Sequence, residues 1–393
     1  MLLGGIRYLL PVIEEAHKLG HYVITADYVP NNIAHKFSDE YVNVSIVDKE
    51  AVLRIATEKE IDGIMSFGVD PGVVSAAYVA EKMGLPSPGP YKSVEILQNK
   101  NLFRKYLKDN GFNVPWAESF SSIDEALSYD FNYPVIVKPT DSAGSKGVSR
   151  VDSQVELRSA LENAFTHSIK GKVIVEAFIE KQGCSSDTDC FSVDGILEFV
   201  SFSSQLFDEQ AANPYTPAAY FWPSTFTKAQ EEYLTCELQR LISLLGMKTS
   251  IYNVETRIGE DGKPYIMEVS PRGGGNRLAE MIRFATGVDM IAASVKAALG
   301  EPIDSIKQKP YDGFWAEVIL HADKGGIFQG VEIDHNIKRY LIEKDLWVKQ
   351  GEVIRDFEGA NDAIGTLVFN FDSFKEQQSV INSDKKPWSI LRD

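Results

Sequence analysis

Short apolar runs alternate with helix-like runs through the first ninety residues, and this rhythm constrains the fold strongly. The strand-like runs "MLLGG", "YVITADY" and "DGIMSF" are separated by the amphipathic runs "PVIEEAHKLG" and "EAVLRIATEKEI". Such alternation is typical of βαβ units and a parallel sheet. Gly4 and Gly5 match a dinucleotide-binding turn only weakly, because the spaced G-x-G-x-x-G motif is absent. We predict an N-terminal α/β domain over residues 1–92, with the glycine pair in a tight turn.

A second unit begins after the segment "GLPSPGPYKS", whose prolines and glycines indicate a linker. The run that starts at Ser93 has helical apolar spacing up to the stop signal Gly111, and it predicts one helix. Further on, strand-like runs alternate with helical runs preceded by three capping-box patterns: Ser122 with Glu125, Ser153 with Glu156, and Thr227 with Gln230. We predict an α+β domain over residues 93–305, with a small lobe at about 115–182. Residues 306–393 form a C-terminal α+β lobe of mostly short strands and turns.

Composition excludes several classes of partner. The chain has 393 residues, 40 Lys and Arg against 56 Asp and Glu, and a formal net charge of −16. This charge repels a phosphate backbone and an anionic membrane surface, so nucleic acid is not expected as a partner. No run of eighteen apolar residues and no signal-peptide pattern is present, so no membrane association is expected. The three cysteines show no CxxC spacing, and we expect reduced thiols in a cytoplasmic protein.

The stretch "PVIVKPTDSAGSKGVSRV", residues 134–151, runs from a strand-like segment into glycines and lysines. It is not a Walker A loop, because a strand-like run follows where that motif requires a helix. Lys138 at the end of the first strand could reach a phosphate as a point charge. The loop also offers backbone N–H groups that could close over phosphate oxygens, those of Ser142, Ala143, Gly144, Ser145 and Gly147. Taken alone, the segment fits an ordinary hairpin loop equally well.

Two carboxylates lie on strand-like runs joined by the turn "GEDGK". A hairpin would bring Glu255 and Glu268 to one face. Two carboxylates that leave room for phosphate oxygens and water suit Mg²⁺, so the pair could be a metal site. Alternatively, the two glutamates are ordinary solvated strand residues that bind no metal. Arg272 follows in "SPRGGGNR", a glycine run where a substrate could approach the backbone closely.

The order of these motifs resembles the ATP-grasp superfamily, and within it the carboxylate-amine ligases. The resemblance rests on five elements in sequence order: Lys100 in a helix, Lys138 with its glycine loop, the hinge strand "VEAFI", the pair Glu255 and Glu268, and "SPRGGGNR". It covers nearly the whole chain. It implies an ATP-grasp fold with a Rossmann-like N-terminal domain, a central two-lobed ATP-binding domain and a C-terminal lobe.

The resemblance also implies roles for individual residues. Lys100 and Lys138 would bind the ATP phosphates, and the glycine loop would cover the β- and γ-phosphates. The backbone of Ala177 and Ile179 would read the adenine edge, with the Glu176 side chain near its amino group. The remaining implied roles are Mg²⁺ or Mn²⁺ binding by Glu255 and Glu268, catalysis by Arg272 together with Lys138, and substrate binding by Arg272, Gly273, Gly274, Asn276 and Arg277.

Two departures from the family pattern matter. Ser270 stands where the family often has a metal-binding Asn, and its hydroxyl would give an altered metal site. After the hinge, the usual ribose-binding glutamate is missing, and Asp187 or Asp189 would take its place.

The resemblance implies an ATP-dependent ligase that joins a carboxylate to an amine through an acyl phosphate, with amino acids as substrates and a homodimer as a common assembly. The aromatic segment at residues 207–226 would either shape the substrate pocket or form an ordinary loop. Two alternatives remain open: a purine-pathway or biotin-carboxylase-like enzyme, and a nucleotide-binding regulatory protein without turnover, which only Ser270 favours.

Overall fold

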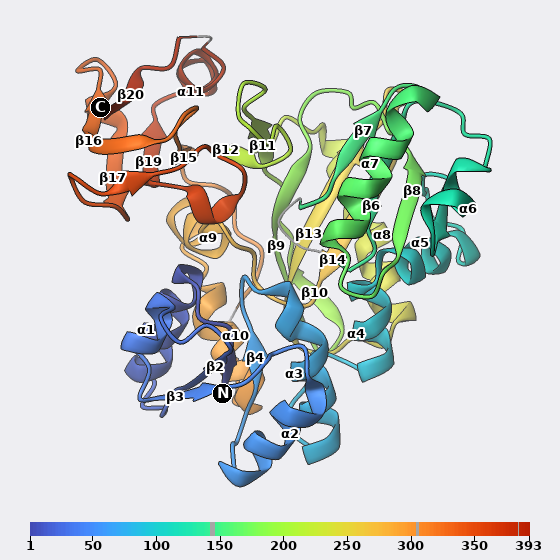
Figure 1. The fold of residues 1–393 in the computed structure, drawn as a ribbon. Coiled ribbons are helices and arrows are strands. Elements are labelled where there is room, and N and C mark those ends of the chain that lie inside the picture. Colours follow the sequence, from blue (N-terminus) through green and yellow to red (C-terminus); the bar gives the residue numbers. More distant parts are fainter. Residues whose placement is uncertain (142–145, 304–305, 384) are drawn as a thin grey trace.

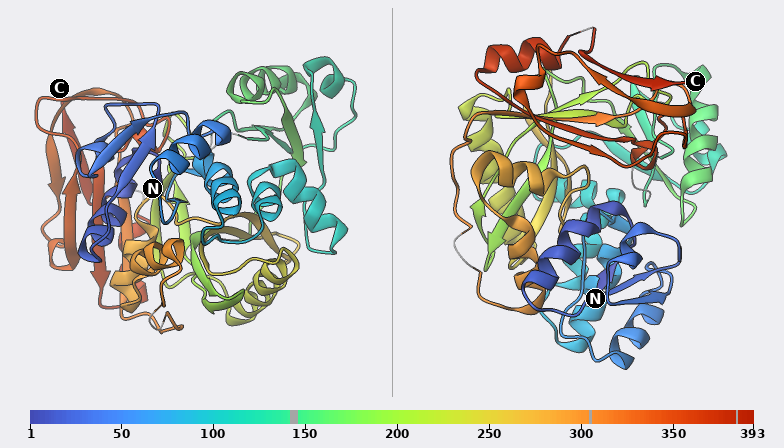
Figure 2. Two further views of the ribbon diagram at one scale, coloured as in Figure 1. Left: turned by 90° about the horizontal axis from the view of Figure 1, so that it is seen from below. Right: turned by 90° about the vertical axis from the view of Figure 1, so that its left-hand side faces the viewer.

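The computed structural model describes residues 1–141, 146–303, 306–383 and 385–393. Three groups of elements surround the central strands (Figure 1): the N-terminal domain in blue, a small lobe in green and cyan, and a C-terminal lobe in orange and red. The left view in Figure 2 shows the small lobe and the C-terminal lobe on either side of the N-terminal domain. None of the helices in the described ranges is both long and apolar enough to cross a membrane.

The N-terminal domain is the predicted parallel sheet, with strand order β3-β2-β1-β4. Its elements are β1 (Leu2–Leu3), η1 (Arg7–Leu9), α1 (Leu10–Lys18), β2 (Ile24–Asp27), η2 (Ile33–Lys36), β3 (Glu40–Asn43), α2 (Lys49–Glu58), β4 (Met65–Ser66) and α3 (Asp70–Met83). Asp48 caps α2 by accepting a hydrogen bond from the Ala51 N–H. The α3 helix follows β4 closely, so its first residue, Asp70, lies at the edge of the sheet that faces the central domain.

The single helix predicted from Ser93 is two helices, α4 (Tyr91–Gln98) and α5 (Lys100–Asp109). Asn99 between them has an extended backbone, and its side chain accepts a hydrogen bond from the Leu102 N–H. Asn side chains compete with the helical backbone in this way, which ends one helix and caps the next. The break places Lys100 at the first position of α5. Ser93 lies inside α4 and donates its hydroxyl to the Leu245 carbonyl instead of capping.

The small lobe is an antiparallel sheet of order β5-β8-β6-β7, with α6 and α7 packed beside it. Its elements are β5 (Ala117–Phe120), α6 (Ile123–Leu127), β6 (Val135–Pro139), β7 (Ser149–Val151), α7 (Gln154–His167) and β8 (Val173–Ala177). Val135 and Val137 point into this core, and so the alternation along β6 turns Lys138 to the other face.

The central sheet has the order β10-β9-β13-β14 and is antiparallel throughout. Its elements are β9 (Ser186–Val193), β10 (Ile196–Phe199), α8 (Lys228–Leu244), β13 (Ser250–Ile258), β14 (Pro264–Ser270), α9 (Leu278–Thr286) and α10 (Met290–Leu299). The capping box of Thr227 and Gln230 at the start of α8 is present as predicted. The predicted β13–β14 hairpin is also present.

The C-terminal lobe contains a five-stranded sheet of order β11-β12-β15-β19-β17 and a three-stranded sheet of order β18-β16-β20. Its elements are β11 (Ser204–Phe207), β12 (Pro217–Trp222), β15 (Phe314–Leu320), β16 (Gly326–Ile333), η3 (Lys338–Tyr340), β17 (Leu341–Leu346), β18 (Val353–Ile354), η4 (Ala360–Asp362), β19 (Gly365–Phe371), α11 (Phe374–Ile381) and β20 (Trp388–Arg392). The segment 207–226 is therefore partly strand, because β12 pairs with β15. The β11–β12 hairpin belongs to the C-terminal sheet. Both strands nevertheless precede residue 306, where we predicted that the C-terminal lobe begins.

Candidate active site

Glu255 and Glu268 are direct partners in the β13–β14 hairpin. Opposite residues of an antiparallel pair share one face, so the two carboxylates lie side by side. The pKa of Glu255 is raised, first because the surrounding protein displaces water from it and then because Glu268 and Asp187 carry the same charge. Nζ of Lys100 lies 3.7 Å from a carboxylate oxygen of Glu268. Adjacent carboxylates with open oxygens are the donor set that Mg²⁺ prefers, so these residues fit the ion.

Lys138 belongs to a buried group of charges between the small lobe and α5. Its ammonium donates to the carboxylate of Glu176, which also accepts from Nε of Arg104 at 2.8 Å. Glu176 is 3% exposed and Arg104 is 4% exposed. Burial alone would raise the pKa of Glu176, but the two cations lower it to about 2. Both Glu176 oxygens are therefore engaged, and the predicted contact of this side chain with the adenine amino group finds no support here.

The hinge residues lie at the end of β8, with Ala177 as its last residue and Ile179 just beyond it. The Ala177 N–H donates to the Trp116 carbonyl at 2.8 Å, and the Ile179 carbonyl accepts from Nη1 of Arg257 at 3.0 Å. The guanidinium of Arg150 lies 4.3 Å from the centre of the Phe178 ring. Adenine recognition by the backbone of this segment stays a prediction.

Only part of the predicted phosphate loop is described. Ser142, Gly144 and Ser145 lie outside the described residues. Gly147 has a φ of +71°, and a Cβ atom there would come within 3.0 Å of His167. Both the left-handed backbone and this close contact require glycine at the position.

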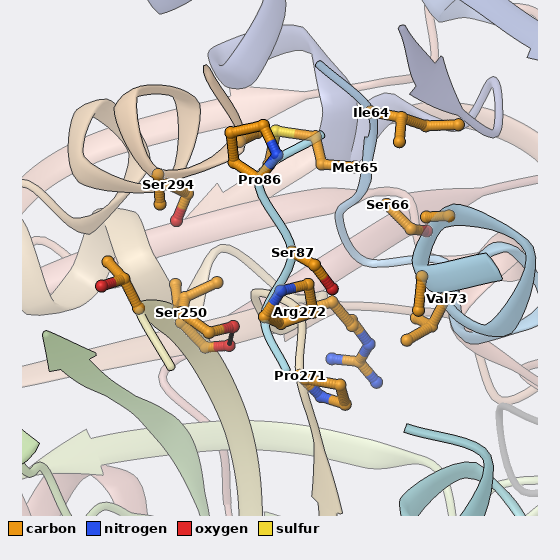
Figure 3. A pocket seen from close by; sticks show the side chains of 17 residues that line it. Ile64, Met65, Ser66, Val73, Pro86, Ser87, Ser250, Pro271, Arg272 and Ser294 are labelled. Carbon is orange, nitrogen blue, oxygen red and sulfur yellow. Dashed lines mark hydrogen bonds between the residues drawn. The ribbon is translucent and has the colours of Figure 1, made fainter. Parts of the chain in front are cut away.

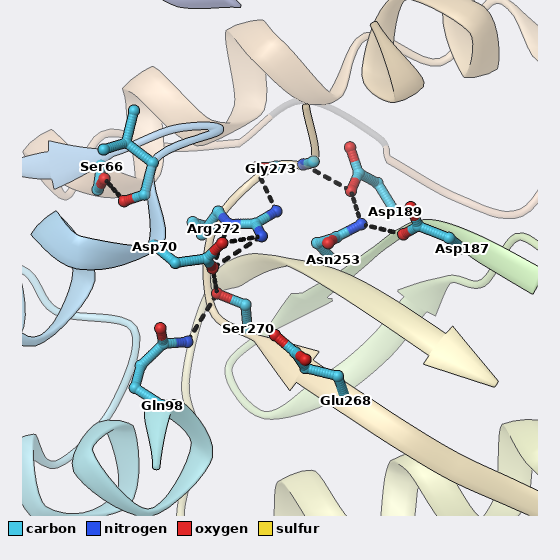
Figure 4. A network of polar contacts seen from close by, with 12 residues as sticks. Ser66, Asp70, Gln98, Asp187, Asp189, Asn253, Glu268, Ser270, Arg272 and Gly273 are labelled. Atoms are coloured by element: carbon cyan, nitrogen blue, oxygen red, sulfur yellow. Dashed lines mark hydrogen bonds and ion pairs between the residues drawn. The ribbon is translucent and has the colours of Figure 1, made fainter. Parts of the chain in front are cut away.

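Arg272 is held by an aspartate from the N-terminal domain (Figure 4). Its Nε and Nη2 donate to the two oxygens of Asp70 at 2.8 and 2.7 Å. Burial lowers the pKa of Arg272, but the Asp70 carboxylate offsets this, and the pKa lies above its usual value. A bidentate pair of this kind fixes the orientation of the guanidinium.

Ser270 belongs to the same network and does not present a free hydroxyl. Its Oγ donates to Asp70 at 2.9 Å and accepts from Nε2 of Gln98 at 2.7 Å. Figure 4 shows Gln98, which belongs to α4, reaching Ser270 of this network. The hydroxyl proton is thus committed to Asp70, and metal coordination by Ser270 stays a prediction.

Asp187 and Asp189 lie on β9, opposite Glu255 and Asn253 of β13. Asn253 donates to Asp187 at 2.7 Å, and the Gly274 N–H donates to Asp189 at 2.8 Å. Burial raises the pKa of each aspartate to about 7. The pair therefore lies beside the candidate metal ligand Glu255 and the glycine run, and the predicted ribose role of either aspartate stays a prediction.

The end of the glycine run turns through two left-handed residues, Asn276 with a φ of +50° and Arg277 with a φ of +58°. Asn276 accepts a hydrogen bond from Tyr8 at 2.8 Å and donates to Tyr220 at 3.1 Å. Arg277 pairs with Glu280 and with two groups of the C-terminal lobe. Residues of both the N-terminal domain and the C-terminal lobe thus contact the end of the glycine run. Gly273 packs closely against the Phe67 ring, because a Cβ atom on residue 273 would lie 2.2 Å from the ring atoms.

Comparison with known proteins identifies the architecture. Residues 112–288 match the family model described as D-ala D-ala ligase C-terminus. The solved structure of an L-amino acid ligase from Bacillus licheniformis matches with a TM-score of 0.82 at 21% identity, covering 100% of this chain and 98% of that chain. The chain has the ATP-grasp fold. The fold class predicted from the sequence is confirmed.

Two further matches belong to this group. The biotin carboxylase domain dimer of the 2-oxoglutarate carboxylase from Hydrogenobacter thermophilus, solved with MgADP, ADP and bicarbonate, has a TM-score of 0.73 at 18% identity, covering 100% of this chain and 90% of that chain. The carbamoyl phosphate synthase large chain of Thermoanaerobacter sp. (strain X514) is 23% identical over 286 residues, which is 71% of this chain and 26% of the relative. The chain spans about a quarter of the length of the curated relatives it matches.

A pocket lies behind Arg272, between the N-terminal domain and the central sheet (Figure 3). Its walls are mainly apolar and include Val73, Pro86 and Pro271. Neither Glu255 nor Glu268 lines it. The pocket is therefore separate from the candidate metal site.

Sequence reasoning missed several residues of the site: Asp70, Gln98, Arg104, Tyr220 and Asn253. Of these residues, Tyr220 lies in the aromatic segment 207–226 that we singled out, but no role was predicted for any of the five. The one local signal was the position of Asp70 at the start of a helix directly after a strand, where an acidic residue is favourable.

Proposed function

We propose that this protein is an ATP-dependent carboxylate-amine ligase that releases ADP and phosphate. The observation that carries the proposal is the arrangement of Glu255 and Glu268 as strand partners, with Lys100 beside them. Arg272 lies close enough for the charge of Glu268 to affect its pKa. Phosphoryl transfer needs positioning and charge neutralisation rather than covalent help from the protein, and these residues can supply both.

The nucleotide would be held by groups from two lobes. Glu255 and Glu268 would hold Mg²⁺, or Mn²⁺ in its place, and the ion would neutralise phosphate charge. Lys100 and Lys138 would contact phosphate oxygens as point charges. The backbone N–H groups of the loop that ends at Gly147 would cover the phosphates.

Arg272 would act on the substrate side. Its guanidinium would stabilise the charge that develops as the substrate carboxylate takes the γ-phosphoryl group. Asp70 fixes its direction, so the arginine would not need to reorganise during the reaction. Gly273 and Gly274 would let the substrate approach the backbone, with Asn276 and Arg277 at the end of the run.

The chemistry has two steps. The carboxylate oxygen attacks the γ-phosphorus of ATP, ADP leaves, and an acyl phosphate forms. The amine nitrogen, as the free base, then attacks the acyl carbon, phosphate leaves with the electrons of the broken C–O bond, and the nitrogen gives up a proton to water. The substrates we propose are a small carboxylic acid and a small amine, with amino acids first, because the similar L-amino acid ligase is named for this substrate class. A homodimer stays a prediction.

A mass-spectrometric screen tests the proposal directly. The protein is incubated with ATP, Mg²⁺ and pairs of amino acids, and products are searched for the mass of an amide together with ADP. Glu268→Ala should lower turnover by roughly 10²- to 10³-fold, because a ligand of the metal is lost. Glu260→Ala is the matched control, since Glu260 lies exposed in the turn of the same hairpin.

Four kinds of result would contradict the proposal or a part of it. AMP and pyrophosphate as products would exclude the acyl-phosphate route. A normal rate for Glu268→Ala would remove that residue from the site. Tight ATP binding without turnover on any pair would favour the regulatory alternative, whereas amide formation on a phosphorylated sugar amine or carboxylation with bicarbonate would favour the other enzyme classes.

A further inference from the structure

Arg104 is a buried cation whose guanidinium joins two parts of the candidate active site. It belongs to α5 and is 4% exposed. Its Nε donates to Glu176 of β8 at 2.8 Å, and its Nη1 donates to the Met267 carbonyl of β14 at 2.7 Å. Met267 directly precedes Glu268, so one side chain contacts both the small lobe and the strand that carries a candidate metal ligand.

The carboxylate of Glu176 connects Arg104 to Lys138. One of its oxygens accepts from Arg104, and the other accepts from the Lys138 ammonium. Burial raises the pKa of Glu176, but the charges of Arg104 and then of Lys138 lower it to about 2. An ammonium has three N–H donors, so Lys138 can hold Glu176 with one and turn the others toward phosphate oxygens. Arg104 therefore keeps this carboxylate ionised and in place while the lysine binds an anion.

The helix of Arg104 also carries the second lysine proposed to bind phosphate. Lys100 is the first residue of α5 and lies four positions before Arg104, so the two side chains share one side of the helix. Nζ of Lys100 lies 3.7 Å from a Glu268 oxygen. Burial lowers the pKa of Lys138, and the charges of Arg104 and Lys100 lower it further. The groups proposed to bind phosphate and metal thus meet beside α5.

We propose that Arg104 is a positioning residue that couples the phosphate-binding Lys138 to β14, the strand that carries Glu268. It holds Lys138 through the carboxylate of Glu176 and holds Glu268 through the backbone of Met267. A planar guanidinium fixes the direction of both N–H groups at once, which a flexible ammonium does not. The inference rests on the proposed function and adds the group that sets the distance between its phosphate and metal ligands. The alternative is an ion pair that only stabilises the fold.

Nucleotide binding tests this role without knowledge of the substrates. The full-length protein is titrated by calorimetry with a non-hydrolysable ATP analogue at saturating Mg²⁺, and then with Mg²⁺ at a fixed concentration of the analogue. Arg104→Lys keeps the positive charge but removes the planar fork. Lys105→Gln is the matched control, because Lys105 pairs with Asp109 on the exposed side of the same helix. Circular dichroism and urea unfolding show which variants are folded.

For Arg104→Lys we expect the Kd of the analogue and the half-saturating Mg²⁺ concentration each to rise by roughly 10- to 100-fold, the usual effect of losing a group that orients a ligand residue. Lys105→Gln should stay within about twofold of the wild type. Glu176→Asp is a second variant, which keeps the charge but shortens the link, and it should raise the Kd of the analogue similarly. The effects of Arg104→Lys and Glu176→Asp should not add in the double variant, because both residues act along one chain of contacts.

Two outcomes overturn the inference without touching the ligase proposal. One is a folded Arg104→Lys variant that binds the analogue and Mg²⁺ as the wild type does, and the other is full additivity in the double variant. Tight binding of the analogue with no amide formed from any pair of substrates overturns the ligase proposal alone. A wild type that does not bind the analogue in the presence of Mg²⁺ overturns both.

Discussion

Glu176→Gln is the most informative stability test, because Glu176 is the carboxylate that pairs with two buried cations among the described residues. Its carboxylate accepts from Arg104 at 2.8 Å and from Lys138, and its side chain is 3% exposed. Breaking a buried ion pair by removing one partner typically costs about 3–5 kcal/mol. The pKa of Glu176 gives a consistent figure, because a shift from 4.5 to about 2 corresponds to about 3 kcal/mol. We expect a loss of about 3–5 kcal/mol in the free energy of unfolding.

Urea unfolding followed by circular dichroism and tryptophan fluorescence measures this loss. Asp109→Asn is the matched control: Asp109 pairs with Lys105 on the surface of the same helix that carries Arg104, and it should cost less than about 0.5 kcal/mol. The sign of the pH dependence adds a second check. Because the pKa of Glu176 is lowered in the folded state, its carboxylate stabilises the protein fully above pH 4.5, and this stabilisation is lost as the pH falls toward about 2. Glu176→Gln has no such carboxylate, so the wild type should show this loss and the variant should not. A cost below about 1 kcal/mol for Glu176→Gln would refute the reasoning.

Three further predictions follow from individual contacts. Asp70→Asn removes the counter-charge of buried Arg272, so unfolding should cost about 3 kcal/mol less and turnover should fall at least tenfold; unchanged kinetics would contradict the positioning role. Asp189 has a folded pKa of about 7 against an ordinary 3.8, so its contribution to stability is lost as the pH rises through this window, and Asp189→Asn should unfold at higher urea than the wild type at pH 8. Thr227→Ala removes the cap of α8 and should cost about 1 kcal/mol in urea unfolding, with Tyr233→Phe on the same helix as the near-neutral control.

Short sequence patterns correctly predicted the elements that depend on residues close to one another in sequence. The turn "GEDGK" between two alternating runs predicted the β13–β14 hairpin, and the hairpin makes Glu255 and Glu268 partners. The capping box at Thr227 was likewise correct. Apolar spacing alone could not show the break at Asn99, because the spacing continues through it while the side chain of Asn99 competes for a backbone N–H.

Contacts between distant segments could not be predicted from one sequence. The bond from Arg272 to Asp70 spans 202 positions, and the bond from Gln98 to Ser270 spans 172. The strand β12 pairs with β15 across almost a hundred residues, so neither the segment 207–226 nor the boundary at residue 306 could be placed by composition. The sequence indicated that Ser270 would alter the metal site, whereas the hydroxyl is bonded to Asp70.

Transfer of an oxygen label tests the acyl-phosphate mechanism most directly. A screen with hydroxylamine, which traps an acyl phosphate as a hydroxamate, first identifies an acid that the protein activates, and that acid is then prepared with ¹⁸O in its carboxylate. The acid is incubated with ATP, Mg²⁺ and an amino-acid acceptor, and the released phosphate is analysed by mass spectrometry. An acyl phosphate intermediate predicts that one ¹⁸O atom appears in the phosphate, with ADP as the other product. Released phosphate without ¹⁸O, or ¹⁸O appearing in AMP, would contradict the account.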